Sequence, residues 1–134
     1  MDEYDINCEE IRRENEEYLK IFEEDLKAAG LAPKTIRNHV SNAEFFINDY
    51  LMLRSLHHID QGLYELGSFF DFFIHKCMWS TPDSVGKTAT SIKKFYKCMA
   101  EHGKISTKDY ELIADEIKEG TPLWKSECAA FNNW

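Results

Sequence analysis

Apolar residues in this chain recur every three to four positions, and this spacing restricts the fold more than any other feature. A period of about 3.6 residues is that of an α-helix. Alternation of apolar and polar residues, which strands would require, never lasts more than a few positions. Each of the three prolines stands where a helix could begin. The pattern predicts an all-α protein.

Capping residues divide this periodic sequence into five expected helices. Gly30 should end the first, Pro33 should lie in the first turn of the second, and Gly103 should end the fourth. Ser80 or Thr81 should cap the fourth, and Ser106 or Thr107 the fifth. The third is so rich in Phe that the others should surround it. The expected ranges are about 8–29, 33–54, 64–77, 82–102 and 107–120.

The length of 134 residues fits one domain, and 43% hydrophobic residues suffice for a core. We expect a helical domain over residues 1–120 and an aromatic tail over 121–134 that docks on it or on a partner. No run of eighteen apolar residues occurs, and the acidic N-terminus differs from a signal peptide. The expectation is a cytoplasmic protein without a membrane partner.

The net charge of −8 is distributed unevenly. Residues 1–29 hold eleven acids and four bases, residues 30–104 seven acids and nine bases, and residues 105–134 six acids and three bases. Four lysines and no acid lie between Ser84 and Ala100. This is the only sustained positive stretch in the sequence, and it points to a polyanion as one class of partner.

The triplet Gly86-Lys87-Thr88 invites comparison with a phosphate-binding loop. A Walker A motif requires a glycine five positions before the Gly-Lys pair, where this chain has Thr81. The motif also lies between a strand and a helix, whereas Pro82 and a helical pattern stand here. The lysines therefore need an explanation other than nucleotide hydrolysis.

Two expected helices carry a polar, cationic face opposite their apolar stripe. Such a face lets lysines reach phosphate oxygens and lets Arg or Asn reach base edges. A lysine stripe is also the ordinary appearance of a solvated amphipathic helix, so the pattern alone leaves both interpretations open. The candidate contacts are Lys34, Thr35, Arg37, Asn38 and Ser41 in the second helix and Lys87, Ser91, Lys93, Lys94 and Lys97 in the fourth.

Short motifs in a fixed order resemble the N-terminal core-binding domain of tyrosine recombinases, the phage integrase group. They are Gly30-Leu31 at a helix end, APKTI at 32–36, IKKFY at 92–96 and EHGKI at 101–105. The resemblance covers about residues 12–118 and implies a SAM-like, orthogonal bundle of four to five helices. It also implies weak, salt-sensitive contact with double-stranded DNA through the second and fourth helices, at the ten residues named above.

The sequence departs from that family in two respects. It contains no catalytic constellation of arginines, histidines and nucleophilic tyrosine, so we expect this chain to have no enzymatic activity. A recombinase or another protein would then supply catalysis. Its acidic balance opposes DNA binding wherever the first helix would face the duplex. The alternative is therefore a protein-interaction bundle that has lost DNA binding, and the sequence leaves its oligomeric state open.

Other constellations give no complete site. His57 and His58 are adjacent, and the pair His75 and Cys77 lacks further ligands nearby in sequence, so no metal and no cofactor are predicted. The four cysteines form no CxxC pair and should be free thiols. A Phe cluster could stack on bases, but its presence on nearly every helix face favours core; its members are Phe69, Phe70, Phe72 and Phe73.

Overall fold

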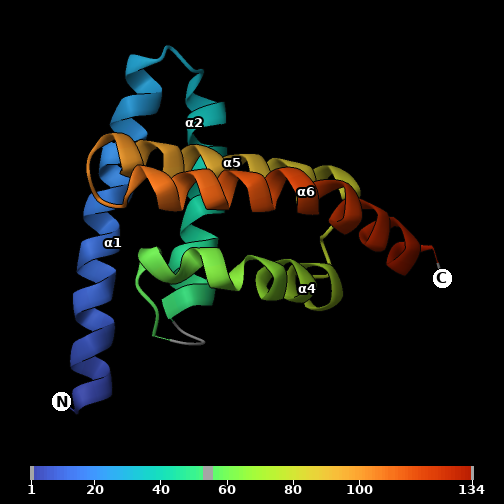
Figure 1. Cartoon of the computed structure of the whole chain (residues 1–134), viewed down its shortest axis with the longest axis horizontal. Helices are drawn as coiled ribbons and strands as arrows, with labels where there is room; N and C mark the ends of the chain where they lie inside the picture. The colour runs from blue at the N-terminus through green and yellow to red at the C-terminus, as the bar shows by residue number, and fades with distance from the viewer. Residues whose placement is uncertain (1, 53–55, 134) are drawn as a thin grey trace.

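The computed structural model describes residues 2–52 and 56–133, which form an all-helical bundle (Figure 1). The antiparallel helices α5 and α6 lie side by side, α1 and α2 cross them, and α4 lies beneath them in the view shown. The described residues contain no β-strand. The elements are α1 (Glu3–Ala28), α2 (Pro33–Glu44), the π-helical η1 (Phe45–Met52), the 3₁₀-helical η2 (Ile59–Glu65), α4 (Leu66–Lys76), α5 (Pro82–Glu101) and α6 (Thr107–Asn132).

The predicted all-α class is confirmed, and most helix ends follow their local chemistry. Gly30 and Gly103 have φ of 80° and 73°, a conformation that glycine adopts without penalty. Each closes its helix by donating a backbone N–H three residues back, to Lys27 and Ala100 respectively. Thr81 caps α5 in a reciprocal pair with Ser84.

Two predicted boundaries shift because of signals that the periodicity does not contain. The first helix begins at Glu3, because the side chain of Asp2 accepts the N–H of Asp5 at 2.9 Å and caps it there. The second helix changes after Glu44 from α to π winding. Its predicted end at Arg54 lies outside the described residues. The third α-helix begins at Leu66, because the residues before it, Ile59–Glu65, form a 3₁₀-helix.

The expected helix end at Gly120 is wrong, because α6 continues to Asn132 with Pro122 in its interior. The ring of Trp124 occupies the space that a Cβ at position 120 would need, so this glycine permits close packing instead of ending a helix. Trp124 stacks on Phe70 with ring centroids 4.2 Å apart, and Cys128 is fully buried. The helix therefore runs through position 120, and residues 121–132 are helical.

The Phe-rich α4 is core. Phe69, Phe70 and Phe73 are buried. Phe69 packs edge-on against Phe46 of η1, with ring centroids 4.9 Å apart. These buried rings are not available as a platform for bases. Among the described residues, no helix combines the length and apolar character that crossing a bilayer demands.

A buried polar contact joins α1 to the π-helical η1. The amide of Asn15, which is 1% exposed, donates to the carbonyl of Ile47 at 3.4 Å and to Asn48 Oδ1 at 2.8 Å. Its own Oδ1 has no hydrogen-bond partner. One side chain thus fixes η1 against α1 at the cost of an unsatisfied oxygen.

A second buried contact fixes η2 against α5. The hydroxyl of Tyr96, in a side chain with no exposed surface, donates to the carbonyl of Ile59 at 2.7 Å. A Cβ at position 62 would overlap this hydroxyl, so Gly62 is required for the close approach. Gly67 in α4 has no atom near the corresponding position.

These two glycines give a matched test of the packing. Gly62→Ala should lower the free energy of unfolding by about 2 kcal/mol, because the methyl group displaces a hydrogen-bonded tyrosine. Gly67→Ala should leave stability unchanged or raise it by up to about 1 kcal/mol through helix propensity. Urea unfolding measures both. Equal effects of the two substitutions would contradict the packing described.

Candidate functional site

A polar cleft of about 650 Å³ lies between α2, α5 and the C-terminal half of α6. Its wall carries hydroxyl, amide and ammonium groups, all of which can donate hydrogen bonds to anionic oxygens. Among its lining residues Asp83 is the only acid, and none belongs to the acidic α1. The lining residues are Thr35, Asn38, His39, Ser41, Asn42, Asp83, Ser84, Gly86, Lys87, Thr88, Thr90, Ser91, Thr121 and Lys125.

The structure brings half of the predicted contacts together in this cleft. Thr35, Asn38 and Ser41 face it from α2, and Lys87 and Ser91 face it from α5. The remaining predicted residues do not line it, although all of them are exposed on the same two helices. Within the described residues these cations form no ion pair; they are Lys34, Arg37, Lys93, Lys94 and Lys97.

Ser91 departs from its predicted role as an exposed contact. It is 1% exposed, and its hydroxyl donates to the carbonyl of Lys87 at 3.0 Å. The same oxygen accepts from Asn42 Nδ2 at 3.1 Å and lies 2.8 Å from His39 Nδ1. Ser91 therefore joins α2 to α5 at the base of the cleft and does not offer its hydroxyl to a ligand.

His39 contacts Ser91 from the neighbouring helix α2. Its Nδ1 lies 2.8 Å from Ser91 Oγ, which is a hydrogen-bond distance. Burial, and then the positive charge of Lys94, lower the pKa of His39 below its usual value. The folded protein thus favours a neutral imidazole at the edge of the cleft.

The charges at the cleft are only partly free. Lys87 pairs with Asp83 one turn earlier at 3.0 Å, with both side chains about three-quarters exposed (73% and 75%). Such an exposed pair is weak, so a phosphate oxygen can replace the carboxylate. Lys125 of α6 lies across Gly86, where a Cβ would come within 2.6 Å of its Cε. This lysine is a second cation at the cleft.

A smaller cavity of about 280 Å³ adjoins the cleft and carries negative charge. Glu44 and Asp49 line it together with Phe45, Phe73 and Trp79. Partial burial raises the pKa of Asp49 above its usual value. Glu44 and Asp49 therefore place negative charge next to the cleft, where α2 ends and η1 begins.

Thr121 and Lys125 line the cleft but were not among the predicted contacts. They were missed because they follow Gly120, a residue that predicts the end of a helix. Ile117, Trp124 and Cys128 are separated by seven and then four residues, a helical spacing that could have extended the helix through this segment.

Comparison with known proteins adds no assignment to this geometry. No protein-family model, no curated protein and no solved structure matches the chain. The structure establishes a small all-α bundle. What the cleft binds has to be argued from its own chemistry.

The depressed pKa of His39 predicts a pH-dependent stability. A lowered folded-state pKa means that the unfolded chain binds the proton more readily, so this contribution is complete above the unfolded pKa and is lost as pH falls. We expect His39→Asn, whose amide can replace Nδ1, to lose less stability than the wild type between about pH 7.5 and 5. Urea unfolding across this range provides the measurement.

The matched control is Ser41→Ala, which changes an exposed residue of the same cleft that carries no titratable group in this pH range. It should retain the wild-type loss of stability. An unchanged loss in His39→Asn would show that His39 does not titrate as its surroundings imply.

Proposed function

We propose that this chain binds double-stranded DNA through the faces of α2 and α5 that meet at the cleft, and that it has no catalytic role of its own. The observation that carries the proposal is the convergence of two polar faces on one cleft flanked by unpaired cations. Residues from α2 and α5 line the same cavity although about fifty positions separate them, as Ser41 and Ser91 illustrate.

The exposed cations suit the phosphate backbone. Lys34 and Arg37 on α2 and Lys93, Lys94 and Lys97 on α5 have no carboxylate partner to give up among the described residues. The first turn of α2 adds backbone donors, because Ala32 caps it without a side-chain hydrogen bond. Ammonium groups and helix N-termini are common phosphate ligands.

The cleft residues suit a more selective contact. Asn38 and Arg37 can each form paired hydrogen bonds with base edges in the major groove. Thr35 and Ser41 provide short hydroxyl groups beside them. In the core-binding domains that the sequence resembles, a bundle of this size contacts one face of a duplex, with catalysis supplied by a different domain.

The charge distribution limits the affinity. The net charge of −8 repels DNA as a whole, and much of the acid lies on α1, outside the cleft. About five or six phosphate contacts are available, so binding should be weak and should depend strongly on salt.

Titration of labelled duplex at several salt concentrations tests this proposal. A plot of log K against log salt should have a slope of magnitude about 4 to 5, since each phosphate contact contributes about 0.9. The absence of binding at low ionic strength would reject the proposal.

Charge reversal locates the surface. The triple variant Lys87→Glu, Lys94→Glu, Lys97→Glu should lose binding while retaining helicity, because it replaces attraction by repulsion at α5. The matched control is Lys20→Glu, Lys108→Glu, Lys118→Glu, which changes the net charge equally at exposed positions outside the cleft. The control should bind less well than the wild type but clearly better than the α5 variant. Equal loss in the two variants would indicate a nonspecific charge effect.

A protein-interaction role is the second candidate, favoured by an exposed apolar pair between α4 and α5. Met78 is 98% exposed and Trp79 is 63% exposed. A self-associating chain should become monomeric in the variant Met78→Ser, Trp79→Ser, as measured by sedimentation velocity. An unchanged profile would leave this pair without that role.

A further inference from the structure

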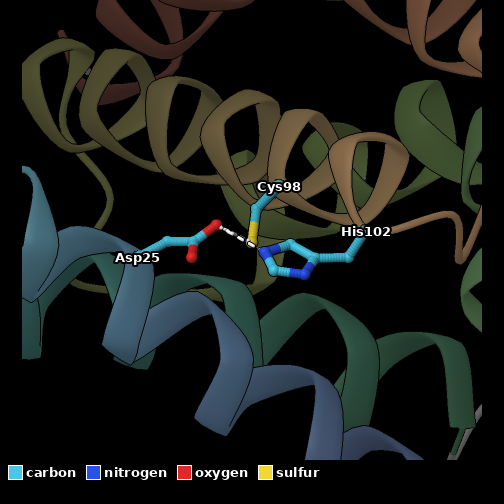
Figure 2. Close-up of side chains that lie close together, drawn as sticks. All are labelled: Asp25, Cys98 and His102. Atoms are coloured by element: carbon cyan, nitrogen blue, oxygen red, sulfur yellow. Dashed lines mark hydrogen bonds and ion pairs between the residues drawn. The ribbon is translucent and has the colours of Figure 1, made fainter.

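Three side chains of different chemistry meet where α1 and α5 end (Figure 2). Asp25 lies in the last turn of α1, Cys98 lies in α5, and His102 caps α5. Cys98 Sγ donates to Asp25 Oδ2 at 3.0 Å, and His102 Nε2 lies 2.9 Å from the same oxygen. The cluster therefore joins residues that are 73 and 77 positions apart.

Helical backbone holds Asp25 and Cys98, and His102 is the cap residue directly after α5. Cys98 and His102 are four residues apart on one helix, so they project from the same face one turn apart. The turns closed by Gly30 and Gly103 fix the helix ends next to the cluster. Two of the three side chains thus belong to helices and the third to a helix cap, which favours a defined ligand geometry.

The geometry points to a zinc site formed by Asp25 Oδ2, Cys98 Sγ and His102 Nε2. One ligand atom from each residue lies within 4.8 Å of the others. Tetrahedral coordination, with Zn–S of about 2.3 Å and Zn–N of about 2.0 Å, places ligand atoms roughly 3 to 4 Å apart. The two hydrogen-bond distances already lie near this range, so small rotations of the side chains complete the site.

The charges favour a divalent cation. The Asp25 carboxylate and a Cys98 thiolate would repel each other, since their ligand atoms lie only 3.0 Å apart. A cation between the two groups turns this repulsion into attraction. On coordination the Cys98 proton passes to solvent, and one thiolate and one carboxylate then balance the charge of Zn²⁺.

The exposure of the ligands defines the remaining coordination position. Cys98 is buried, whereas Asp25 and His102 each have side chains 41% exposed. The metal would thus have protein on its thiolate side and solvent on the other. Three protein ligands and one water form the open type of zinc site, which can exchange its fourth ligand.

The thiolate distinguishes this cluster from another in the bundle. Asp71, His75 and Glu127 also lie close together, but they offer only oxygen and nitrogen atoms at the surface. Soft thiolate ligands select Zn²⁺ over Mg²⁺ and Ca²⁺. The zinc site connects the C-terminal ends of α1 and α5, and it does not depend on whether the cleft binds DNA.

Cobalt substitution provides the test, with reduced protein freed of metal by a chelator. Co²⁺ should produce a thiolate-to-metal charge-transfer absorption in the wild type, and Zn²⁺ should abolish it by displacement. Zn²⁺ should also raise Tm, because it binds only the folded chain tightly. The Asp71 cluster cannot produce this absorption because it has no sulfur.

Variants assign the absorption to the three residues. Cys98→Ser should lose the absorption and the Tm increase, whereas Cys8→Ser, which removes another buried thiol, should keep both. His102→Gln changes an exposed side chain, and it should weaken Co²⁺ binding by about 10-fold or more. Absence of the absorption in the wild type, or its persistence in Cys98→Ser, would overturn the proposal.

Discussion

The helix α4 buries one large apolar face, and the need to cover this face governs how the other elements are placed; its members are Leu66, Phe69, Phe70, Phe73 and Ile74. Phe69 packs against Phe46 of η1, and Phe70 packs against Trp124 of α6. Trp124 lies beyond Pro122, so α6 must continue past a residue that lacks an N–H and costs about 3 kcal/mol inside a helix. The stacking of the partly buried Trp124 on Phe70 and the full burial of Cys128 offset this cost, and the helix therefore continues.

This requirement of the core also shapes the candidate site. Once α6 extends over α4, Thr121 and Lys125 reach the cleft between α2 and α5. Lys125 can approach closely because position 86 of α5 is a glycine. A residue that resembles part of a phosphate loop in sequence thus provides room for a lysine from another helix. The polar cleft is in this sense a product of apolar packing elsewhere.

The features that could be predicted from sequence are those that depend on near neighbours. Gly30, Gly103 and Thr81 act on backbone within a few residues, and their roles follow from residue type. Gly120 could not be interpreted in this way, because its role depends on the ring of Trp124 in the packed helix. Ser91 stands among lysines but is buried by partners on α2. The spacing of Cys98 and His102 is visible in sequence, whereas the approach of Asp25 from α1 is not.

The π winding of η1 bears on how this chain tolerates changes in length. A π-helix pairs each N–H with the carbonyl five residues earlier, so removal of one residue would let the segment close as an ordinary α-helix. Each residue of an α-helix turns the chain by about 100°. If Ile47 and Leu51 stay in the core, such a deletion would rotate α2 about its helix axis. Asn38 would then no longer face α5. The π winding of η1 thus determines how the polar face of α2 is oriented relative to the buried residues Ile47 and Leu51.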